Sequence, residues 1–366
     1  MKKNNFMRIT SFALLFALVI FSLYGKDKTQ YPLQAGYIGV GLKKMASDPT
    51  SMVASPHPFA TNAALEMLNR GGNAVDAAIA AMMVSAVLDT GKTSFGGGAE
   101  ITYYDAKNNK TIVINAEPNS FKNDVMPYNG ERDSRTGRSI RVPGAIAGFY
   151  LAIQKYGVLP WKNVIEPAIF YAQNGFPLHG EAYATIQSNY ATLTLQPTAR
   201  KIFAPSGFLP QVGDVFKQPE LAETLTKIAE HGADYFYKGS FAERMVQAIR
   251  DIGGKATIED FFSYQPLELE PVNGTYKEYH IIGPPIPSKG VTALIEGMNI
   301  LENVDLKSIG HYANSVDSLQ WMIETLQVLF EDVARYSGVL ELDRDLANLL
   351  IISLLHSFVN IFLKLQ

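Results

Sequence analysis

Residues 71–78 read Gly71–Gly72–Asn73–Ala74–Val75–Asp76–Ala77–Ala78, and this stretch sets the local fold. Gly71 is expected to end a helix over residues 61–70, because glycine readily adopts the left-handed conformation found after helices. Asn73 is expected to cap a second helix, with Asp76 three residues later in the capping-box position. The following run from Ala77 to Val87 is almost wholly small and apolar. Such a helix is typically buried on most of its sides.

The next element is a glycine loop, Gly96, Gly97 and Gly98, followed by an expected strand at residues 101–104. A second strand is expected at residues 111–115, with the hairpin connection between the two. A phosphate-binding loop is excluded, because such a loop needs a helix N-terminus after the glycines and a strand follows here. The glycines are instead expected to allow close backbone approach beside a cleft.

The rest of the chain is mostly helical in pattern, and no internal repeat or low-complexity linker divides it. The expected fold class is α+β, one mostly helical domain with a few paired strands. A further strand is expected at residues 276–282. Further helices are expected at residues 144–156, 161–174, 218–231, 240–252, 257–262, 291–302 and 315–336.

Composition excludes several classes of function. The 366 residues are 47% hydrophobic and 18% charged, which favours a sizeable packed core over disorder. A net charge of −3 does not indicate a nucleic-acid partner, which usually requires a basic face. The absence of cysteine excludes disulfides, thiolate metal sites and a cysteine nucleophile. None of the six histidines is spaced as a metal-binding pair, so no metal or cofactor is expected.

Residues 1–25 have the pattern of a secretory signal peptide. Lys2, Lys3 and Arg8 precede an apolar run from Phe12 to Phe21 that is short for a membrane span. The expected location is therefore outside the cytoplasm, periplasmic or extracellular. An uncleaved N-terminal anchor is the alternative, and no stable membrane span is expected beyond this segment.

No catalytic set is evident from residue types alone. A Gly-x-Ser-x-Gly nucleophile motif is absent. His57 lies rigidly between Pro56 and Pro58, but a packed histidine is the favoured interpretation. No combination of nucleophile, base and oxyanion-binding groups emerges within the chain.

Twelve short sequence motifs between about residues 35 and 338 resemble those of the γ-glutamyltranspeptidase family. They occur in the same order as in the family and with similar spacing. They include Met52–Val53–Ala54–Ser55–Pro56–His57–Pro58 and the stretch from Gly71 to Ala78 quoted above. The motifs lie at residues 52–58, 63–68, 71–78, 95–98, 142–148, 156–161, 166–168, 174–177, 232–239, 254–260, 299–302 and 332–338.

The resemblance implies part of an αββα N-terminal nucleophile hydrolase sandwich, with residues 26–338 as the helix-rich large-subunit portion. In that family a precursor cuts itself in two, and the new N-terminal Thr of the small subunit attacks a γ-glutamyl amide such as that of glutathione. The implied partners are a small-molecule γ-glutamyl substrate and a small subunit from the same precursor. The implied substrate-binding residue of this chain is Glu117.

Three departures from the family pattern leave alternatives open. The Thr-Thr-His-type junction that supplies the nucleophile is absent from this sequence, so the chain alone is expected to be inactive. The Arg that normally precedes the Glu and grips the substrate carboxylate is replaced by Ala116. Residues 339–366 form a divergent apolar tail. The alternatives are a relative acting on another amide, such as a β-lactam side chain or a polyglutamate, a non-catalytic exported binding module, and a frameshifted remnant.

Overall fold

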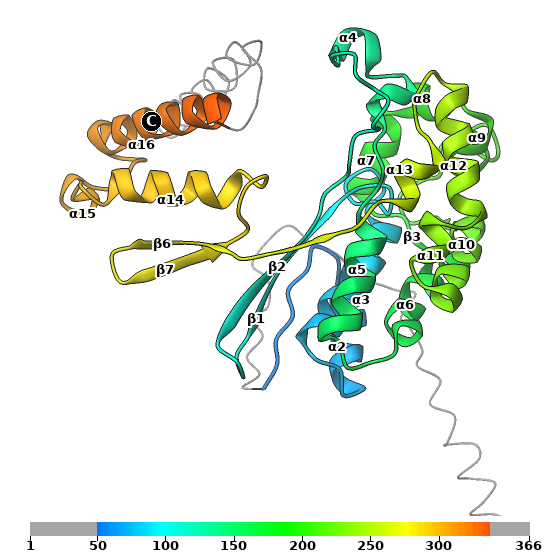
Figure 1. Ribbon diagram of the computed structural model, residues 1–366, viewed down its shortest axis with the longest axis horizontal. Helices are drawn as coiled ribbons and strands as arrows, with labels where there is room; N and C mark the ends of the chain where they lie inside the picture. The colour runs from blue at the N-terminus through cyan, green and yellow to red at the C-terminus, as the bar shows by residue number, and fades with distance from the viewer. Residues whose placement is uncertain (1–49, 337–366) are drawn as a thin grey trace, which may run out of the picture.

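The computed structural model describes residues 50–336 and shows a helix-rich α+β fold (Figure 1). The expected signal segment, residues 1–25, and the apolar tail, residues 339–366, lie outside the described residues. The helices are α2 (Pro58–Asn69), α3 (Ala74–Leu88), α4 (Gly130–Asp133), α5 (Ala145–Tyr156), α6 (Trp161–Asn174), α7 (Gly180–Ser188), α8 (Tyr190–Leu193), α9 (Pro197–Phe203), α10 (Pro219–His231), α11 (Asp234–Tyr237), α12 (Ser240–Asp251), α13 (Ile258–Phe262), α14 (Gly290–Leu301), α15 (Leu306–Ile309) and α16 (Val316–Tyr336), with a short 3-10 helix η1 (Gly137–Ser139). The strands are β1 (Ala99–Asp105), β2 (Lys110–Ala116), β3 (Phe176–Pro177), β4 (Val215–Phe216), β5 (Leu267–Leu269), β6 (Val272–Tyr276) and β7 (Tyr279–Gly283).

The main sheet is antiparallel, in the order β1-β2-β5, so β1 lies at its edge. The expected hairpin is confirmed, with Ala99 opposite Ala116 and Asp105 opposite Lys110. One face of the sheet packs on α5, and its alternate residues Ala99, Ile114 and Ala116 belong to the hydrophobic core. The helical body therefore covers one face of the sheet, so that one sheet layer packs on one layer of helices.

Helix α3 lies at the centre of the helical body and packs against α2, α5 and α6. The expected capping box is confirmed: Asn73 Oδ1 accepts hydrogen bonds from the N–H groups of Val75 and Asp76, and Asp76 accepts one from the N–H of Asn73. Gly71 has φ +85°, as expected for a residue that follows a helix. Eleven of the fifteen residues of α3 are buried, which agrees with its small, apolar sequence.

Asp76 also joins α3 to the connection between α5 and α6. Its carboxylate accepts hydrogen bonds from Val158 N at 3.1 Å and Leu159 N at 3.2 Å, and the side chain is fully buried. A buried carboxylate is stable only when such bonds replace its hydration. One side chain thus fixes the start of α3 and its position against two neighbouring helices.

The expected strand at residues 276–282 is confirmed in part: residues 279–282 lie in β7, but the chain reverses just before them and residue 276 ends β6. Strands β6 and β7 pair antiparallel around a turn in which Lys277 has φ +52°. The hairpin packs on α14 so closely that a Cβ on Gly274 would lie 2.5 Å from Ile295. Helix α14 in turn packs on α16, and Figure 1 shows this group of elements beside the helical body.

Helices α7, α8 and α9 and the short strand pair β3–β4 were not expected from the sequence. The three helices are only nine, four and seven residues long. None of the residues of α8 or α9 is buried, so these helices lack the apolar stripe that reveals a helix in a sequence.

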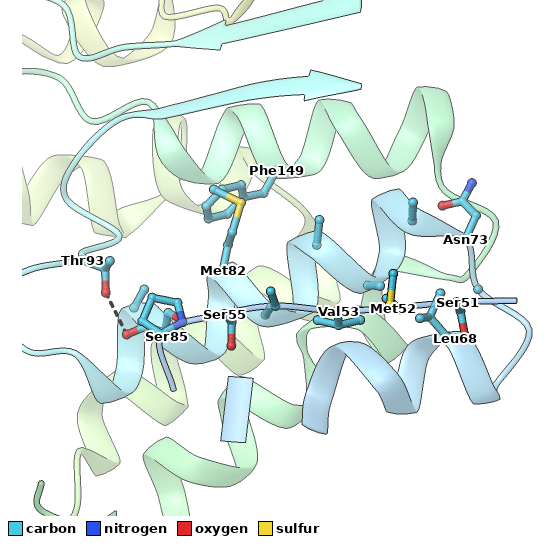
Figure 2. A pocket seen from close by; sticks show the side chains of 18 of the residues that line it. Ser51, Met52, Val53, Ser55, Leu68, Asn73, Met82, Ser85, Thr93 and Phe149 are labelled. Atoms are coloured by element: carbon cyan, nitrogen blue, oxygen red, sulfur yellow. Dashed lines mark hydrogen bonds between the residues drawn. The ribbon is translucent and has the colours of Figure 1, made fainter. Parts of the chain in front are cut away.

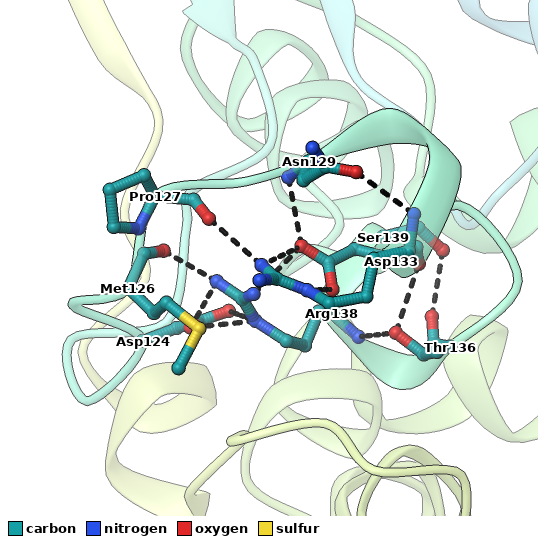
Figure 3. A network of polar contacts seen from close by, with 9 residues as sticks. Asp124, Met126, Pro127, Asn129, Asp133, Thr136, Arg138 and Ser139 are labelled. Atoms are coloured by element: carbon teal, nitrogen blue, oxygen red, sulfur yellow. Dashed lines mark hydrogen bonds and ion pairs between the residues drawn. The ribbon is translucent and has the colours of Figure 1, made fainter.

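A largely buried arginine, Arg138, organises the turn-rich segment between β2 and α5 (Figure 3). Arg138 Nη1 donates to Asp133 Oδ2 at 2.7 Å, and Arg138 Nε donates to Asp124 at 3.0 Å. Arg132 forms a second ion pair with Asp133. The hydrogen bond from Arg132, with further bonds and charges around it, holds the pKa of Asp133 well below its usual range. These ion pairs order the middle of the segment, while Phe121 and Val142 anchor its two ends in the hydrophobic core.

His57 is a packed histidine, as favoured above, and it caps α2. Its Nδ1 accepts a hydrogen bond from Phe59 N at 3.1 Å, and its ring lies 5.1 Å from that of His179, which caps α7 in the same way. Burial, and then the neighbouring His179, lower the pKa of His57 to about 4, while Asp89 acts in the opposite direction.

We expect Asp76→Ala to lower the free energy of unfolding by at least about 2 kcal/mol, since it leaves three N–H groups without their acceptor. The measurement is urea denaturation followed by circular dichroism. Asp234→Asn is the matched control, because the Asp234 side chain is 70% exposed and its ion pair with Lys238 is a surface contact. Equal losses in the two variants would contradict this role of Asp76.

We expect His57 to make the fold sensitive to acid between pH 6.5 and pH 4. Its pKa is about 4 in the folded chain and about 6.5 when unfolded, so the unfolded chain binds the proton first as pH falls. The neutral ring therefore stabilises the fold above pH 6.5, and about 3 kcal/mol of the unfolding free energy is lost by pH 4. His57→Asn retains a capping oxygen but does not titrate. The difference between wild-type and variant unfolding free energies should shrink or change sign across this range; a constant difference would refute the prediction.

Candidate active-site wall

The glycine loop connects β1 to the start of α5. The carbonyl oxygen of Gly97 accepts hydrogen bonds from Gly144 N at 2.9 Å and Ala145 N at 3.1 Å. These are N–H groups at the beginning of α5, which have no partner within the helix. The carbonyl group of Gly97 therefore caps α5, and the two N–H groups that it binds are not free to hold a phosphate.

Close backbone approach is the reason for glycine at two positions of this junction. A Cβ on Gly98 would lie 2.7 Å from Pro118 Cδ and 3.1 Å from Glu117 Cα. A Cβ on Gly144 would collide with the carbonyl group of Ala116 and with the Tyr264 hydroxyl. The third glycine, Gly96, is less restricted, and its N–H donates to Ser94 Oγ.

Two stacked tyrosines hold the same junction from the other side, and sequence reasoning missed both. Tyr264 Oη donates to the carbonyl of Glu117 at 2.8 Å, and Tyr237 Oη donates to the carbonyl of Pro143 at 2.8 Å. Their rings stack at 5.4 Å with an interplanar angle of 10°. Burial raises the pKa of both hydroxyls, so they remain protonated donors. Tyr237 lies in one of the family-like motifs, residues 232–239, and this was the only sequence signal that pointed to it.

The predicted substrate-binding residue, Glu117, is exposed at the end of β2. Among residues 50–336 its carboxylate forms no hydrogen bond or ion pair, so it is available to a ligand. Ala116 is fully buried instead, and its methyl group faces Gly148 of α5. The two neighbouring residues thus serve different purposes: Ala116 packs the sheet on the helix, and Glu117 is presented at its end.

A cavity of about 1100 Å³ lies over one face of α3 (Figure 2). The extended segment 50–56 runs across it, and Gly97 and Gly98 line it, as expected for a glycine loop beside a cleft. The α3 residues that line it are spaced three and four apart along one helix face and are mostly small. They are Ala74, Ala77, Ala78, Ala81, Met82, Ser85 and Ala86.

The hydroxyl groups at this cavity are not arranged as a nucleophile with its base. Ser55 Oγ is bonded to Thr61 Oγ1 at 2.7 Å, and Thr93 Oγ1 donates to the carbonyl of Ser85 at 2.8 Å. Ser94 Oγ accepts from Gly96 N. Residues 50–336 contain no cluster of three or more His, Asp or Glu side chains that could hold a metal ion. Within the same range no helix is long and apolar enough to cross a membrane.

We expect Gly144→Ala to lower the unfolding free energy by more than about 2 kcal/mol, because the added methyl group meets backbone that cannot move independently. Gly130→Ala is the control, since a Cβ there would meet nothing within 4 Å. Differential scanning calorimetry of both variants measures the effect. Equal melting temperatures for Gly144→Ala and Gly130→Ala would contradict the prediction, because they would show that the backbone around residue 144 shifts to accommodate the methyl group.

The chain shares its sequence with one well-defined family. The family model described as gamma-glutamyltranspeptidase matches residues 60–355. The glutathione hydrolase proenzyme of Escherichia coli K12 is 34% identical over 297 residues, which are 78% of this chain and 50% of that protein. The proenzyme of Bacillus subtilis 168 is 32% identical over 316 residues, 83% of this chain and 52% of that protein. The chain therefore spans about half the length of the curated relatives it matches.

The fold is shared with solved structures. Helicobacter pylori γ-glutamyltranspeptidase superimposes with a TM-score of 0.75 at 27% identity, over 82% of this chain and 89% of that one. The Pseudomonas nitroreducens enzyme, solved in complex with L-DON, gives 0.72 at 31% identity, over 80% and 88%. The fold is thus the helix-rich part of an αββα N-terminal nucleophile hydrolase. The extent of the family match, together with identities above 30% over more than two thirds of the chain, shows that the chain belongs to the γ-glutamyltranspeptidase family, of which it covers the large-subunit part.

Proposed function

We propose that this chain forms one wall of the active site of an enzyme that hydrolyses or transfers γ-glutamyl groups, and that a second half supplies the catalytic Thr. The observation that carries the proposal is the junction of the glycine loop with Glu117: the Glu117 backbone lies against Gly98, and its side chain is exposed and makes no hydrogen bond within residues 50–336. Membership of the family and the names of the relatives, which are called proenzymes, support it.

The second half would cover surfaces that residues 50–336 leave open. Within this part of the chain, β1 is the edge of the sheet and has one row of backbone groups without a neighbouring strand, which is a site for another strand. The cavity over α3 has a floor of small apolar residues, which allows a sheet to approach closely. The two features favour a layered partner, such as the small subunit of a single precursor.

The chemistry would proceed by acyl transfer. The Thr hydroxyl attacks the γ-glutamyl amide carbon, its proton passes to the free α-amino group of the same Thr, and the leaving amine receives a proton. Water or an acceptor amine then cleaves the acyl-enzyme. The role of this chain would be to hold the glutamyl group through Glu117 and to exclude water along the face of α3 that lines the cavity.

A second substrate class is favoured by one observation, the replacement of the family Arg by Ala116. The missing guanidinium removes a bidentate clamp on the substrate carboxylate. The chain also resembles the cephalosporin acylase of Bacillus halodurans, with a TM-score of 0.68 at 26% identity over 81% of this chain and 58% of that one. An amide other than a γ-glutamyl amide is therefore the second candidate.

We infer in addition that the protein is exported. Lys2, Lys3 and Arg8 before the apolar run from Phe12 to Phe21 support a signal peptide. The lack of cysteine is compatible with an oxidising compartment, although it does not require one.

The decisive experiment is to sequence the gene from the codon for Tyr336 through about another kilobase, a length set by the roughly half-length match to the relatives. We expect a Thr-Thr-His-type junction and a glycine-rich loop, in this frame or a neighbouring one. Expression of the extended polypeptide should give two fragments by gel, γ-glutamyl-p-nitroanilide hydrolysis, and activity in the periplasmic or secreted fraction.

The 366-residue chain alone is the control and should not turn over this substrate. Replacement of the junction Thr by Ala should abolish both cleavage and hydrolysis. A stop codon with no such coding sequence nearby would refute the enzymatic proposal and favour the non-catalytic module or the remnant. Cleavage without γ-glutamyl hydrolysis would favour the second substrate class.

A further inference from the structure

The glycine loop borders two different cavities. Ser94, Gly97 and Gly98 line the cavity over α3, whereas Phe95 and Gly96 line a second cavity of about 260 Å³. The other walls of the second cavity are α10, α11 and α12, of which α11 packs on both of the others (Figure 1). A ligand in the second cavity therefore contacts the loop without entering the cavity over α3.

Aromatic rings form much of the wall of this second cavity. Phe236 and Phe241 stack with their ring centroids 4.4 Å apart and an interplanar angle of 26°. Phe95 approaches from the glycine loop and is 8% exposed, and Met245 adds its thioether from α12. Phenyl rings and a thioether sulfur both make favourable contacts with an aromatic guest. The wall therefore favours a ligand that carries an aromatic ring.

The polar side chains of the cavity do not call for a charged ligand. Glu220 Oε1 accepts a hydrogen bond from Lys201 Nζ at 2.6 Å, and Thr224 Oγ1 donates to the carbonyl of Glu220 at 2.9 Å. A charged group that entered here would lose its hydration without gaining a counter-ion or a new hydrogen bond. The ligand that fits is therefore neutral.

A cavity with such walls is stabilised by a guest other than water. Lining atoms that face a void lack the dispersion contacts of a packed core. Water needs two to four polar partners, and an engineered cavity of about 150 Å³ lined by leucine, isoleucine and phenylalanine stays dry and binds benzene. The present cavity is larger, so it has room for one benzene ring with a small substituent.

We propose that the cavity between the glycine loop and α10–α12 is a binding site for a small neutral aromatic molecule. The bound ring contacts Phe95 and Gly96. The next two residues, Gly97 and Gly98, cap α5 and pack on the backbone of Glu117. The site thus joins an apolar ligand to the segment that positions Glu117. This inference goes beyond the proposed function and does not depend on it.

The first experiment measures binding and its location on the 366-residue chain. The probes are fluorobenzene and its anionic analogue 4-fluorobenzoate, and ¹⁹F NMR gives the apparent Kd of each. Trp161 reports on the site, because its indole N–H donates to the carbonyl of Ile228, a lining residue, at 2.9 Å. We expect fluorobenzene to bind more tightly than 4-fluorobenzoate and to move the ¹⁵N indole signal of Trp161. The signal of Trp321, on α16, should stay in place; Trp321→Phe assigns the two.

The link to the loop is read from the amide signals of ¹⁵N-glycine-labelled chain. Fluorobenzene should move the signal of Gly96 and leave that of Gly130 in place, since a Cβ on Gly130 would meet nothing within 4 Å. Gly96→Ala identifies the Gly96 signal by its absence. This substitution is a mild one, because the nearest atom to the added Cβ is Ser94 Oγ at 3.3 Å.

Thr224→Phe should weaken fluorobenzene binding at least about tenfold, because the new ring occupies volume that the probe needs. Thr226→Phe is the matched control. Thr226 lies on the same helix but does not line the cavity, and its hydroxyl donates to the carbonyl four residues earlier, as that of Thr224 does. Met245→Phe fills the cavity from α12 and is the independent test if Thr224→Phe does not fold.

Three results would overturn the inference. Absence of saturable fluorobenzene binding would show that the cavity is only a packing defect. Equal affinity for the two probes, or wild-type affinity in Thr224→Phe, would show that the ring binds elsewhere. Binding that moves the Trp161 signal but not that of Gly96 would remove the link to the loop. None of these results bears on γ-glutamyl-p-nitroanilide hydrolysis by the extended polypeptide, which is measured without fluorobenzene.

Discussion

The buried carboxylate of Asp76 is the interaction on which the rest of the fold depends. It accepts N–H groups from the start of its own helix and from the connection between α5 and α6, so three helices are held at one point. Desolvation of a charge is expensive, and these bonds offset it only in one arrangement of the helices. The position of α5 then determines where the sheet can pack.

The second constraint follows from the first, because the sheet packs on α5 through small residues, with the methyl group of Ala116 facing Gly148. Gly98 and Gly144 let the end of β2 pass against the loop and the helix start, and Tyr264 binds the carbonyl of Glu117 there. The backbone of Glu117 is held by the Tyr264 hydroxyl at its carbonyl, by the Asn115 side chain at its N–H and by the close approach of Gly98 at its Cα, although the side chain is itself exposed.

The helical body packs on one face of the sheet through α5. Within residues 50–336, the cavity over α3 and the edge of β1 are two surfaces that offer apolar groups and backbone groups to another element. Under the proposed function, a second piece of the same precursor would cover these surfaces, and each piece would position groups whose partners lie on the other piece or on the substrate.

The sequence by itself determined the features that depend on neighbouring residues. The capping box at Asn73 and Asp76, the buried helix after it and the β1–β2 hairpin are all local, so composition and spacing predicted them. The glycines predicted a close approach, but the segments that approach them, at residues 116–118, were decided by the tertiary structure. Tertiary structure alone decided the rest. The reversal at Lys277 places residue 276 in β6 and residues 279–282 in β7, and Lys277 N donates a hydrogen bond to Glu302 at the end of α14. The bond from Tyr264 to Glu117 joins residues 147 positions apart. The pairing of Glu100 with Asn115 follows from strand register, which no local pattern specifies to one residue.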